Sequence, residues 1–299
     1  MHLISIRDFS KDKLLTWVEE INQYDQNLNS FFNCHPDKVI ALAFFEPSTR
    51  TTLSFSAAAQ RLGARVIGFN DASSSSTVKG ETLEDTIQVC ASFSNAIVMR
   101  HPQEGAAYQA SKVSEVPIIN GGDGGNEHPT QTLLDLYTIS KHFDLEAMGN
   151  KHFLIAGDIA RSRTINSLTY ALAKLKANLT FVEVGNIKLK SAHRNELEAL
   201  GAKIDIAQGY SPDLVKSADV VYCTRIQKER WPLDSDLQPP IFTQDLLEVL
   251  PKTSIVMSPL PRLDELPSSL DHDPRVIIFN QVKNGVPTRM MILEKVLEA

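Results

Sequence analysis

Apolar, strand-like runs alternate with helix-compatible segments along the whole chain, and this alternation limits the possible folds more than any other feature. An amphipathic helix capped by Ser10 comes first. Strand-like runs then lie at 39–45, 65–69, 96–99 and 116–120, and helical segments separate them at 52–62, 81–92 and 104–113. Parallel strands need long crossovers, for which helices are usual. The pattern predicts a mostly parallel sheet with helices on both faces.

The same alternation restarts after a long helix, 130–143, for which Pro129 suits the first turn. Strands and helices are then predicted at 153–156, 164–175, 179–184, 191–200, 203–207, 220–223 and 254–257. We therefore expect an α/β protein with two doubly wound parallel-sheet domains, 1–143 and 144–283, linked by a bridging helix. A closing helix, 288–297, is expected to return to the first domain, so that 284–299 packs on it.

The composition excludes several classes of function. The 299 residues include 30 Lys and Arg against 36 Asp and Glu, a formal net charge of −6. This balance argues against a nucleic-acid or membrane partner. Cys34, Cys90 and Cys223 form no C-x-x-C pattern, and no signal-like or membrane-spanning apolar stretch is visible, so a cytoplasmic protein is expected. The eight histidines show no H-E-x-x-H spacing, and no metal is expected.

Ser48, Thr49, Arg50 and Thr51 lie where the run 39–45 stops and a helix begins. Backbone N–H groups at such a junction are unsatisfied, and the helix dipole adds positive charge. The planar fork of Arg50 suits a phosphate group. The alternative is that these residues form an ordinary N-cap. Taken alone, so short a motif favours this second interpretation.

Further polar segments follow predicted strands, where ligands of α/β sheets bind. They begin at Phe44, Met99, His128, Gly157, Thr224 and Ser258. Taken together and in this order, they resemble the aspartate carbamoyltransferases within the aspartate and ornithine transcarbamylase family, over about residues 39–289. The resemblance implies transfer of a carbamoyl group from carbamoyl phosphate to the amine of L-aspartate, which gives N-carbamoyl-L-aspartate in pyrimidine biosynthesis. It implies no cofactor.

The resemblance assigns residues to the carbamoyl phosphate site. Arg100 would reach both phosphate and carbonyl oxygen, His128 would polarise the carbonyl, and Gln131 would orient the carbamoyl amide. The protonation state of His128 stays open, since either form can donate a hydrogen bond. The implied catalytic residues are Thr51, Arg100, His128 and Lys79, and the implied carbamoyl phosphate ligands are Ser48, Thr49, Arg50, Thr51, Ser75, Arg100, His128, Gln131, Pro259 and Leu260.

The implied aspartate ligands are Lys79, Arg163, Arg225 and Gln227. Two guanidinium groups at a fixed separation can bind both carboxylates of one amino acid, each by a pair of hydrogen bonds. Glu46 and Arg230 resemble the ion-pair partners that stabilise the closed state of the two domains. Ser75 and Lys79 would belong to a loop that enters the site of a neighbouring subunit, which implies a homotrimer with shared sites. Regulatory chains, pathway enzymes and control by nucleotides stay open.

The chain departs from the family pattern at Ser258, where the family usually carries His. The rigidity of the loop and the affinity for aspartate are the properties that this change puts in question. The Leu260–Pro261 bond of this loop is expected to be cis. Three alternatives are a transcarbamylase for ornithine or a related amino acid, a non-catalytic homologue that senses the same ligands, and a dehydrogenase. The last lacks a G-x-G-x-x-G motif.

Overall fold

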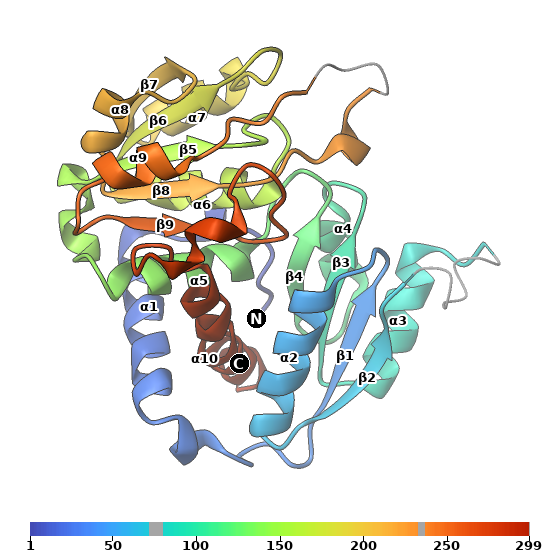
Figure 1. Ribbon diagram of the computed structural model, residues 1–299. Helices are drawn as coiled ribbons and strands as arrows, with labels where there is room; N and C mark the ends of the chain where they lie inside the picture. The colour runs from blue at the N-terminus through green and yellow to red at the C-terminus, as the bar shows by residue number, and fades with distance from the viewer. Residues whose placement is uncertain (72–79, 233–236, 299) are drawn as a thin grey trace. The chain divides into compact units, whose positions relative to one another are not determined.

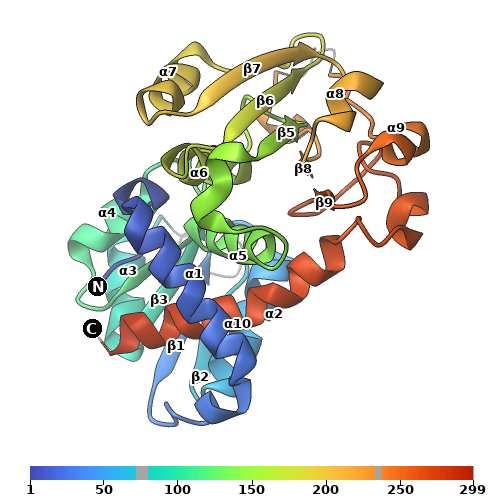
Figure 2. The ribbon, with the colours of Figure 1, turned by 90° about the vertical axis from the view of Figure 1, so that its left-hand side faces the viewer.

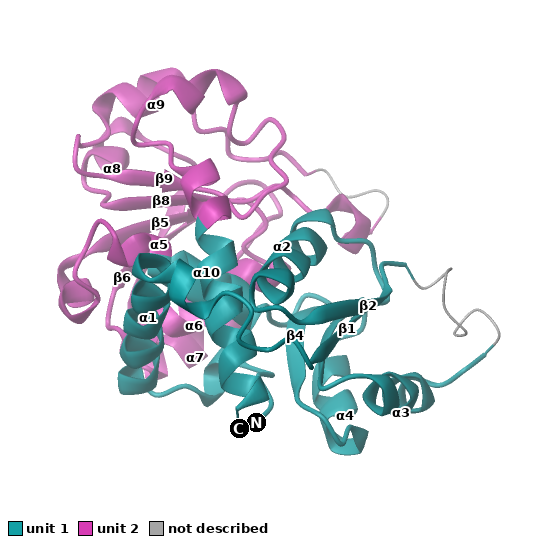
Figure 3. Cartoon of the chain, turned by 90° about the horizontal axis from the view of Figure 1, so that it is seen from below, with its two compact units in different colours: residues 1–137, 284–299 teal, residues 138–283 magenta. Residues whose placement is uncertain are grey.

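The computed structural model describes residues 1–71, 80–232 and 237–298, and they form two compact units (Figure 1, Figure 3). Unit 1 comprises Met1–Tyr137 and Asn284–Ala299, and unit 2 comprises Thr138–Lys283. The chain passes between the units inside two helices, α5 (Pro129–Ser140) and α10 (Ile278–Leu297). The sequence placed the first of these boundaries at residue 143, at the end of the bridging helix rather than within it.

Unit 1 contains a four-stranded sheet in the order β2-β1-β3-β4. Every pairing in it is parallel, as predicted. All of β1 except Val39 is buried, as befits a central strand covered on both faces. Ala41, Met99 and Ala107 belong to a cluster in which α3 and α4 cover one face. The elements are β1 (Val39–Phe44), β2 (Arg65–Phe69), β3 (Ala96–His101), β4 (Ile118–Asp123), α1 (Lys11–Gln26), α2 (Thr49–Arg61), α3 (Leu83–Phe93) and α4 (Ala106–Val113).

Hydroxyl side chains mark the starts of the first helices. The Ser10 hydroxyl accepts a hydrogen bond from the Lys13 N–H at 3.1 Å, so the predicted cap of α1 is confirmed. Thr82 caps α3 in the same way. Helix α2 begins at Thr49 rather than at residue 52, so the hydroxyl-rich segment forms its first turn instead of preceding it.

The C-terminal helix is longer than predicted. The predicted helix began at residue 288, but α10 begins at Ile278 and runs through the Asn-Gly-Val-Pro sequence of residues 284–287. A Cβ at Gly285 would lie 2.4 Å from Nη1 of Arg289, and this nitrogen donates to the Gly285 carbonyl at 3.1 Å. The glycine therefore makes room for a buried guanidinium. Lys295 of α10 pairs with Glu20 of α1 at 2.7 Å, and α1 crosses α10 in Figure 2, which confirms the predicted return.

Unit 2 contains a five-stranded, all-parallel sheet in the order β7-β6-β5-β8-β9. One face packs against α8 and α9 through a cluster that includes Leu154, Val221 and Leu247. These two short helices escaped the sequence interpretation. The elements are β5 (His152–Ala156), β6 (Asn178–Glu183), β7 (Lys203–Gln208), β8 (Val220–Cys223), β9 (Ile255–Met257), α6 (Arg163–Lys174), α7 (Ser191–Ala199), α8 (Pro212–Lys216) and α9 (Gln244–Val249). The predicted fold class is thus confirmed.

The strand orders indicate where each unit can bind a ligand. In unit 1 the chain reverses its direction of winding between β1 and β3, and in unit 2 between β5 and β8. Ligands of open α/β sheets bind beyond the carboxyl ends of strands at such a switch point. The relevant ends are Phe44 and His101 in unit 1, and Ala156 and Cys223 in unit 2. Within the described residues, no helix combines the length and apolar character needed to cross a bilayer.

Candidate active site

The switch point of unit 1 brings Arg100 to the segment after β1. Phe44 and Arg100 are register partners, so the side chain of Arg100 reaches residues that follow β1. Its Nη1 donates to the Ser48 hydroxyl at 3.2 Å, and its Nε lies 2.8 Å from Oε1 of Glu46. The parallel register therefore brings together two of the predicted ligand segments, in which Ser48 and Arg100 are 52 residues apart along the chain.

Ser48 occupies the N-cap position of α2, but its side chain makes no capping hydrogen bond. Its backbone is extended, and its hydroxyl accepts from Arg100 rather than from an N–H group in the first turn of the helix. The structure thus differs from the ordinary N-cap alternative. The amides of Thr49, Arg50 and Thr51 lie in the first turn of a thirteen-residue helix, where an anion is favoured. The Arg50 side chain is exposed, and Thr51 is buried.

His128 and Gln131 lie at the start of α5. His128 is buried, its Nδ1 lies 3.3 Å from the Thr130 hydroxyl, and its carbonyl accepts from the Gln131 N–H. The Gln131 amide group donates from Nε2 to Asp135 at 2.9 Å. This contact points the amide oxygen of Gln131 away from Asp135, so the oxygen is the group suited to accept from a carbamoyl amide.

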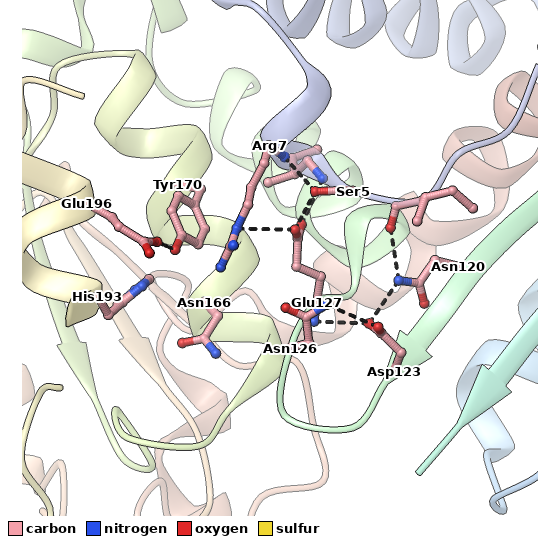
Figure 4. A network of polar contacts seen from close by, with 12 residues as sticks. Ser5, Arg7, Asn120, Asp123, Asn126, Glu127, Asn166, Tyr170, His193 and Glu196 are labelled. Atoms are coloured by element: carbon pink, nitrogen blue, oxygen red, sulfur yellow. Dashed lines mark hydrogen bonds and ion pairs between the residues drawn. The ribbon is translucent and has the colours of Figure 1, made fainter. Parts of the chain in front are cut away.

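The loop between β4 and His128 is fixed by buried polar contacts (Figure 4). Asn120 donates to Oδ1 of Asp123 at 2.9 Å, and the same oxygen accepts from the Glu127 N–H at 3.2 Å. Within β4 itself, a Cβ on Gly121 would lie only 3.0 Å from the Met99 carbonyl. The absence of a side chain there lets β4 end close against β3, and the loop then carries His128 to the carboxyl edge of the sheet.

Glu127 ties this loop to the N-terminal segment (Figure 4). Its carboxylate accepts from the Ile6 N–H at 2.7 Å and from the Ser5 hydroxyl, and Nε of Arg7 lies 3.5 Å away. Burial raises the pKa of Glu127, while the hydrogen bonds from Ser5 and Ile6 oppose the shift. The sequence interpretation missed Glu127, because its partners lie more than a hundred residues away and no local sequence pattern indicates these contacts.

The switch point of unit 2 is organised by Asp158, which sequence reasoning also missed. Asp158 follows β5 and is fully buried. Its Oδ1 accepts from the Arg161 N–H at 3.1 Å, and its Oδ2 accepts from the Gln227 N–H at 2.9 Å and from Nε1 of Trp231 at 3.1 Å. One carboxylate therefore joins the loop after β5 to the loop after β8.

These two loops carry the predicted aspartate ligands. Arg163 is buried and begins α6. Arg225 is partly exposed and forms a bidentate pair with Glu229, with nitrogen–oxygen distances of 3.0 and 2.5 Å. The hydrogen bond from Arg225 lowers the pKa of Glu229 and raises that of Arg225 in return. An incoming carboxylate would meet a guanidinium already oriented by an anion of the protein.

The late proline loop also belongs to unit 2. The predicted cis bond between Leu260 and Pro261 is confirmed, and Leu260 has a φ of 58°. Ser258 is buried, its N–H donates to Oε1 of Gln281 at 3.0 Å, and its hydroxyl accepts from the Leu260 N–H at 3.3 Å. The serine that departs from the family pattern thus stabilises the turn from within, while Pro259 is partly buried.

Some predicted contacts concern residues or arrangements beyond these two clusters. Ser75 and Lys79 lie outside the described residues. Glu46 contacts Arg100 within unit 1, and the Arg230 carbonyl accepts from the guanidinium of Arg161 within unit 2. The pairing of Glu46 with Arg230 stays a prediction, as do the individual substrate contacts.

Two family models match this chain, one over each half. Residues 1–141 match the model of the carbamoyl-P binding domain of aspartate/ornithine carbamoyltransferases, and residues 149–296 match that of the Asp/Orn binding domain. The chain is 43% identical to the aspartate carbamoyltransferase catalytic subunit of Methanocella arvoryzae, with 99% of this chain and 97% of the relative covered. For the corresponding subunit of Methanocaldococcus jannaschii the identity is 41%, with 99% and 98% covered.

Solved structures give the same assignment. Aspartate transcarbamoylase from Trypanosoma cruzi in complex with carbamoyl phosphate and aspartate matches with a TM-score of 0.90 at 32% identity, covering 99% of this chain and 96% of that one. The catalytic subunit of the M. jannaschii enzyme matches with a TM-score of 0.85 at 39% identity, covering 99% and 98%. The chain belongs to the aspartate/ornithine carbamoyltransferase family.

Proposed function

We propose that this protein transfers the carbamoyl group of carbamoyl phosphate to the amine of L-aspartate, giving N-carbamoyl-L-aspartate and phosphate for pyrimidine biosynthesis. The likeness over 99% of the chain to a transcarbamoylase that holds carbamoyl phosphate and aspartate carries this proposal. The polar cluster at the switch point of each unit supports it, because one suits a phosphate and the other suits a dicarboxylate.

The unit 1 cluster would bind carbamoyl phosphate. The first-turn amides of α2 and the side chains of Ser48, Arg50 and Arg100 offer several donors to the phosphate dianion. Each charge-assisted hydrogen bond contributes about 1.5–3 kcal/mol, so a few of them suffice for tight binding. The amide oxygen of Gln131 would accept from the carbamoyl amide, and the carbonyls of Pro259 and Leu260 would contact the same group.

The unit 2 cluster would bind aspartate through Arg163, Arg225 and Gln227. We infer that Glu229 holds Arg225 in position until the substrate carboxylate arrives, since the pair already has fork geometry. Arginine suits this task better than lysine, because its planar donors fix the orientation of a carboxylate as well as its charge. Asp158 would position Gln227 and Trp231 around the same substrate.

The reaction would proceed by direct attack. The lone pair of the neutral aspartate amine forms a bond to the carbonyl carbon, and negative charge develops on the carbonyl oxygen. Thr51, Arg100 and His128 would stabilise that charge, and a single donor of this kind is worth about 2.7–4 kcal/mol. The bond from carbon to the phosphate oxygen then breaks, and phosphate leaves with the proton of the amine. Holding both substrates in place can supply about 7–11 kcal/mol more.

We further propose a cytoplasmic homotrimer in which Ser75 and Lys79 complete the site of a neighbouring subunit. A mobile ammonium suits a position that touches two anionic substrates in turn. A closed state stabilised by Glu46 and Arg230 would exclude water during the reaction.

The direct test is phosphate release from carbamoyl phosphate with aspartate or ornithine as acceptor. The unchanged protein is expected to use aspartate, and Arg225→Ala is expected to lose this activity. Arg194→Ala is a matched control, because Arg194 lies on α7 and its guanidinium pairs with its helical neighbour Glu198 at 2.8 Å. Turnover with ornithine alone would overturn the proposal, and saturable binding of both ligands without product would indicate a sensing homologue.

A further inference from the structure

A thiol, an imidazole and a carboxylate converge in unit 1 at a place that the proposed reaction does not use. Cys34 and His35 lie in the segment that precedes β1, and Glu294 lies near the end of α10. Sγ of Cys34 lies 3.6 Å and Nε2 of His35 lies 2.6 Å from Oε2 of Glu294. All three potential ligand atoms lie within 4.8 Å of one another.

Each side of this cluster is held by contacts of its own. The Asn33 N–H donates to the Arg61 carbonyl at 2.9 Å, and the His35 N–H donates to the Leu62 carbonyl at 2.7 Å, so the segment before β1 is attached to the end of α2. On the other side, Lys295 pairs with Glu20 of α1. The three ligand groups therefore meet because the backbone brings them together, and not only because they attract one another.

The spacing is close to that of a zinc site. Zinc binds sulfur at about 2.3 Å and nitrogen or oxygen at about 2.0–2.2 Å, so tetrahedral ligand atoms lie about 3.3–3.6 Å apart. The Cys34–Glu294 distance of 3.6 Å already fits this range. The contact between His35 and Glu294, at 2.6 Å, would have to open by less than about 1 Å.

The ligand types and their accessibility also favour this ion, and Cys34 is exposed. A thiolate selects zinc over magnesium or calcium, and imidazole and carboxylate complete common zinc sets. The side chains of His35 and Glu294 are 13% and 14% exposed, which leaves access for an ion and a water molecule. A second carboxylate, Glu298, lies one helical turn beyond Glu294 and adds negative charge around Cys34.

We propose that Cys34, His35 and Glu294 bind one zinc ion, with water in the fourth position, and that this ion clamps the C-terminal helix to the segment before β1. The alternative is a hydrogen-bonded cluster without affinity for metal, in which Cys34 donates to the Phe31 carbonyl and His35 pairs with Glu294. Burial, followed by the charge of Glu294, raises the pKa of Cys34 to about 11. Zinc must therefore displace the proton of a neutral thiol, and its binding is expected to release that proton.

The test is titration of the metal-free protein with zinc against a competing chelator, and with cobalt as a spectroscopic probe. We expect one zinc per chain and a thiolate-to-cobalt charge-transfer band. Cys34→Ser and Glu294→Gln are each expected to weaken zinc binding at least about 100-fold, since even changes around a ligand cost about 10–100-fold. Cys90→Ser is the matched control, because Cys90 is a free, partly buried thiol on α3.

A second readout is thermal unfolding, which separates loss of the site from loss of the fold. Zinc is expected to raise the unfolding midpoint of the unchanged protein and of Cys90→Ser, but not that of Cys34→Ser or Glu294→Gln. Circular dichroism identifies any variant that fails to fold. Absence of stoichiometric zinc from the unchanged protein at micromolar free metal would overturn the proposal. Full retention of zinc by both folded ligand variants would overturn it as well.

Discussion

Asp158 is the residue whose substitution should separate positioning from binding in unit 2. Its two carboxylate oxygens accept three donors from two loops. In Asp158→Asn one oxygen becomes an amide nitrogen that cannot accept, so at least one buried donor loses its partner at about 1–3 kcal/mol. We expect the KM for aspartate to rise about tenfold, with the KM for carbamoyl phosphate unchanged in initial-rate measurements.

Asp219→Asn is the control for this substitution. Asp219 accepts from the His152 N–H and from Lys151, both at 2.9 Å, but it precedes β8 and so lies at the amino edge of the same sheet. It is expected to lower stability without changing the KM for aspartate. Equal effects of the two substitutions on this KM would mean that Asp158 acts only through the stability of unit 2.

Asp158 and Glu127 also show what the sequence could not reveal at the scale of residues. Arg100 and His128 could be proposed because the motifs that contain them resemble those of the aspartate carbamoyltransferases. Asp158 and its partner Gln227 are separated by 69 residues, and Glu127 and Ile6 by 121. Such pairs depend on which loops the sheet order brings together, and that order is a property of the folded chain alone.

At the scale of elements, the bounds of strands were more predictable than those of helices. Apolar runs bounded by polar residues gave β2 and β8 their observed limits, 65–69 and 220–223. Helix α10 was predicted too short, beginning at residue 288 rather than at Ile278, and the added part contains Gly285 and Pro287, which disfavour a helix interior. Tertiary packing stabilises the helix through these residues. The guanidinium of Arg289 fills the space beside Gly285 and lies over the ring of Phe55 at 5.1 Å.

This packing predicts that Gly285→Ala destabilises the protein. Alanine favours a helix over glycine by about 1 kcal/mol. Here, however, the new Cβ would lie 2.4 Å from Arg289, and overpacking of a core costs about 1–3 kcal/mol. We expect a lower free energy of unfolding in urea. Gly149→Ala is the control, because its Cβ would meet no atom closer than 3.7 Å. A stabilised Gly285→Ala variant would mean that Arg289 moves aside at little cost.

An ion pair in the segment before α10 should make the stability of the folded protein depend on pH in the acid range. Hydrogen bonds from Arg275 lower the pKa of Asp273 to about 2. A depressed pKa of this kind stabilises the fold above the unfolded value of about 3.9, and the contribution is lost as pH falls through the folded value. The difference in thermal midpoint between the unchanged protein and Asp273→Asn is expected to shrink as pH falls from about 5 towards about 2.

Asp213→Asn serves as the reference for that comparison. The Asp213 side chain is 96% exposed and lies 3.5 Å from Lys216, so its ion pair is screened by solvent. Its difference from the unchanged protein is expected to stay near zero at every pH. A constant difference for Asp273→Asn would show that the pair with Arg275 contributes nothing to acid sensitivity.

At the scale of the whole molecule, positive charge is concentrated locally, although the chain as a whole carries a negative net charge. The formal net charge is −6, yet arginines gather at the switch point of each sheet. Composition could therefore exclude nucleic acids as partners but could not identify the ligands. What identified them was the resemblance of the motifs around Arg100 and Arg225 to those of the family. The structure places Arg100 at the end of β3 and Arg225 after β8, each at the binding edge of its sheet.

The proposed homotrimer with shared sites can be tested by mixing two inactive variants. If Lys79 completes the site of a neighbouring subunit, Lys79→Ala and His128→Ala inactivate different halves of each site. Both variants alone are expected to lack activity. Random assembly of an equimolar mixture makes about three quarters of the trimers mixed, and each of these contains one intact site, so about one quarter of the unchanged activity should return.

The recovery separates a shared site from a site within one chain, because a chain that supplies both residues itself can never be repaired by mixing. Native mass spectrometry would establish that mixed trimers form, and each variant dissociated and reassembled alone would control for damage during exchange. Mixed trimers without activity would place Lys79 in the site of its own chain or outside it. A return near one quarter would instead mean that the trimer is the smallest unit able to carry out the transfer.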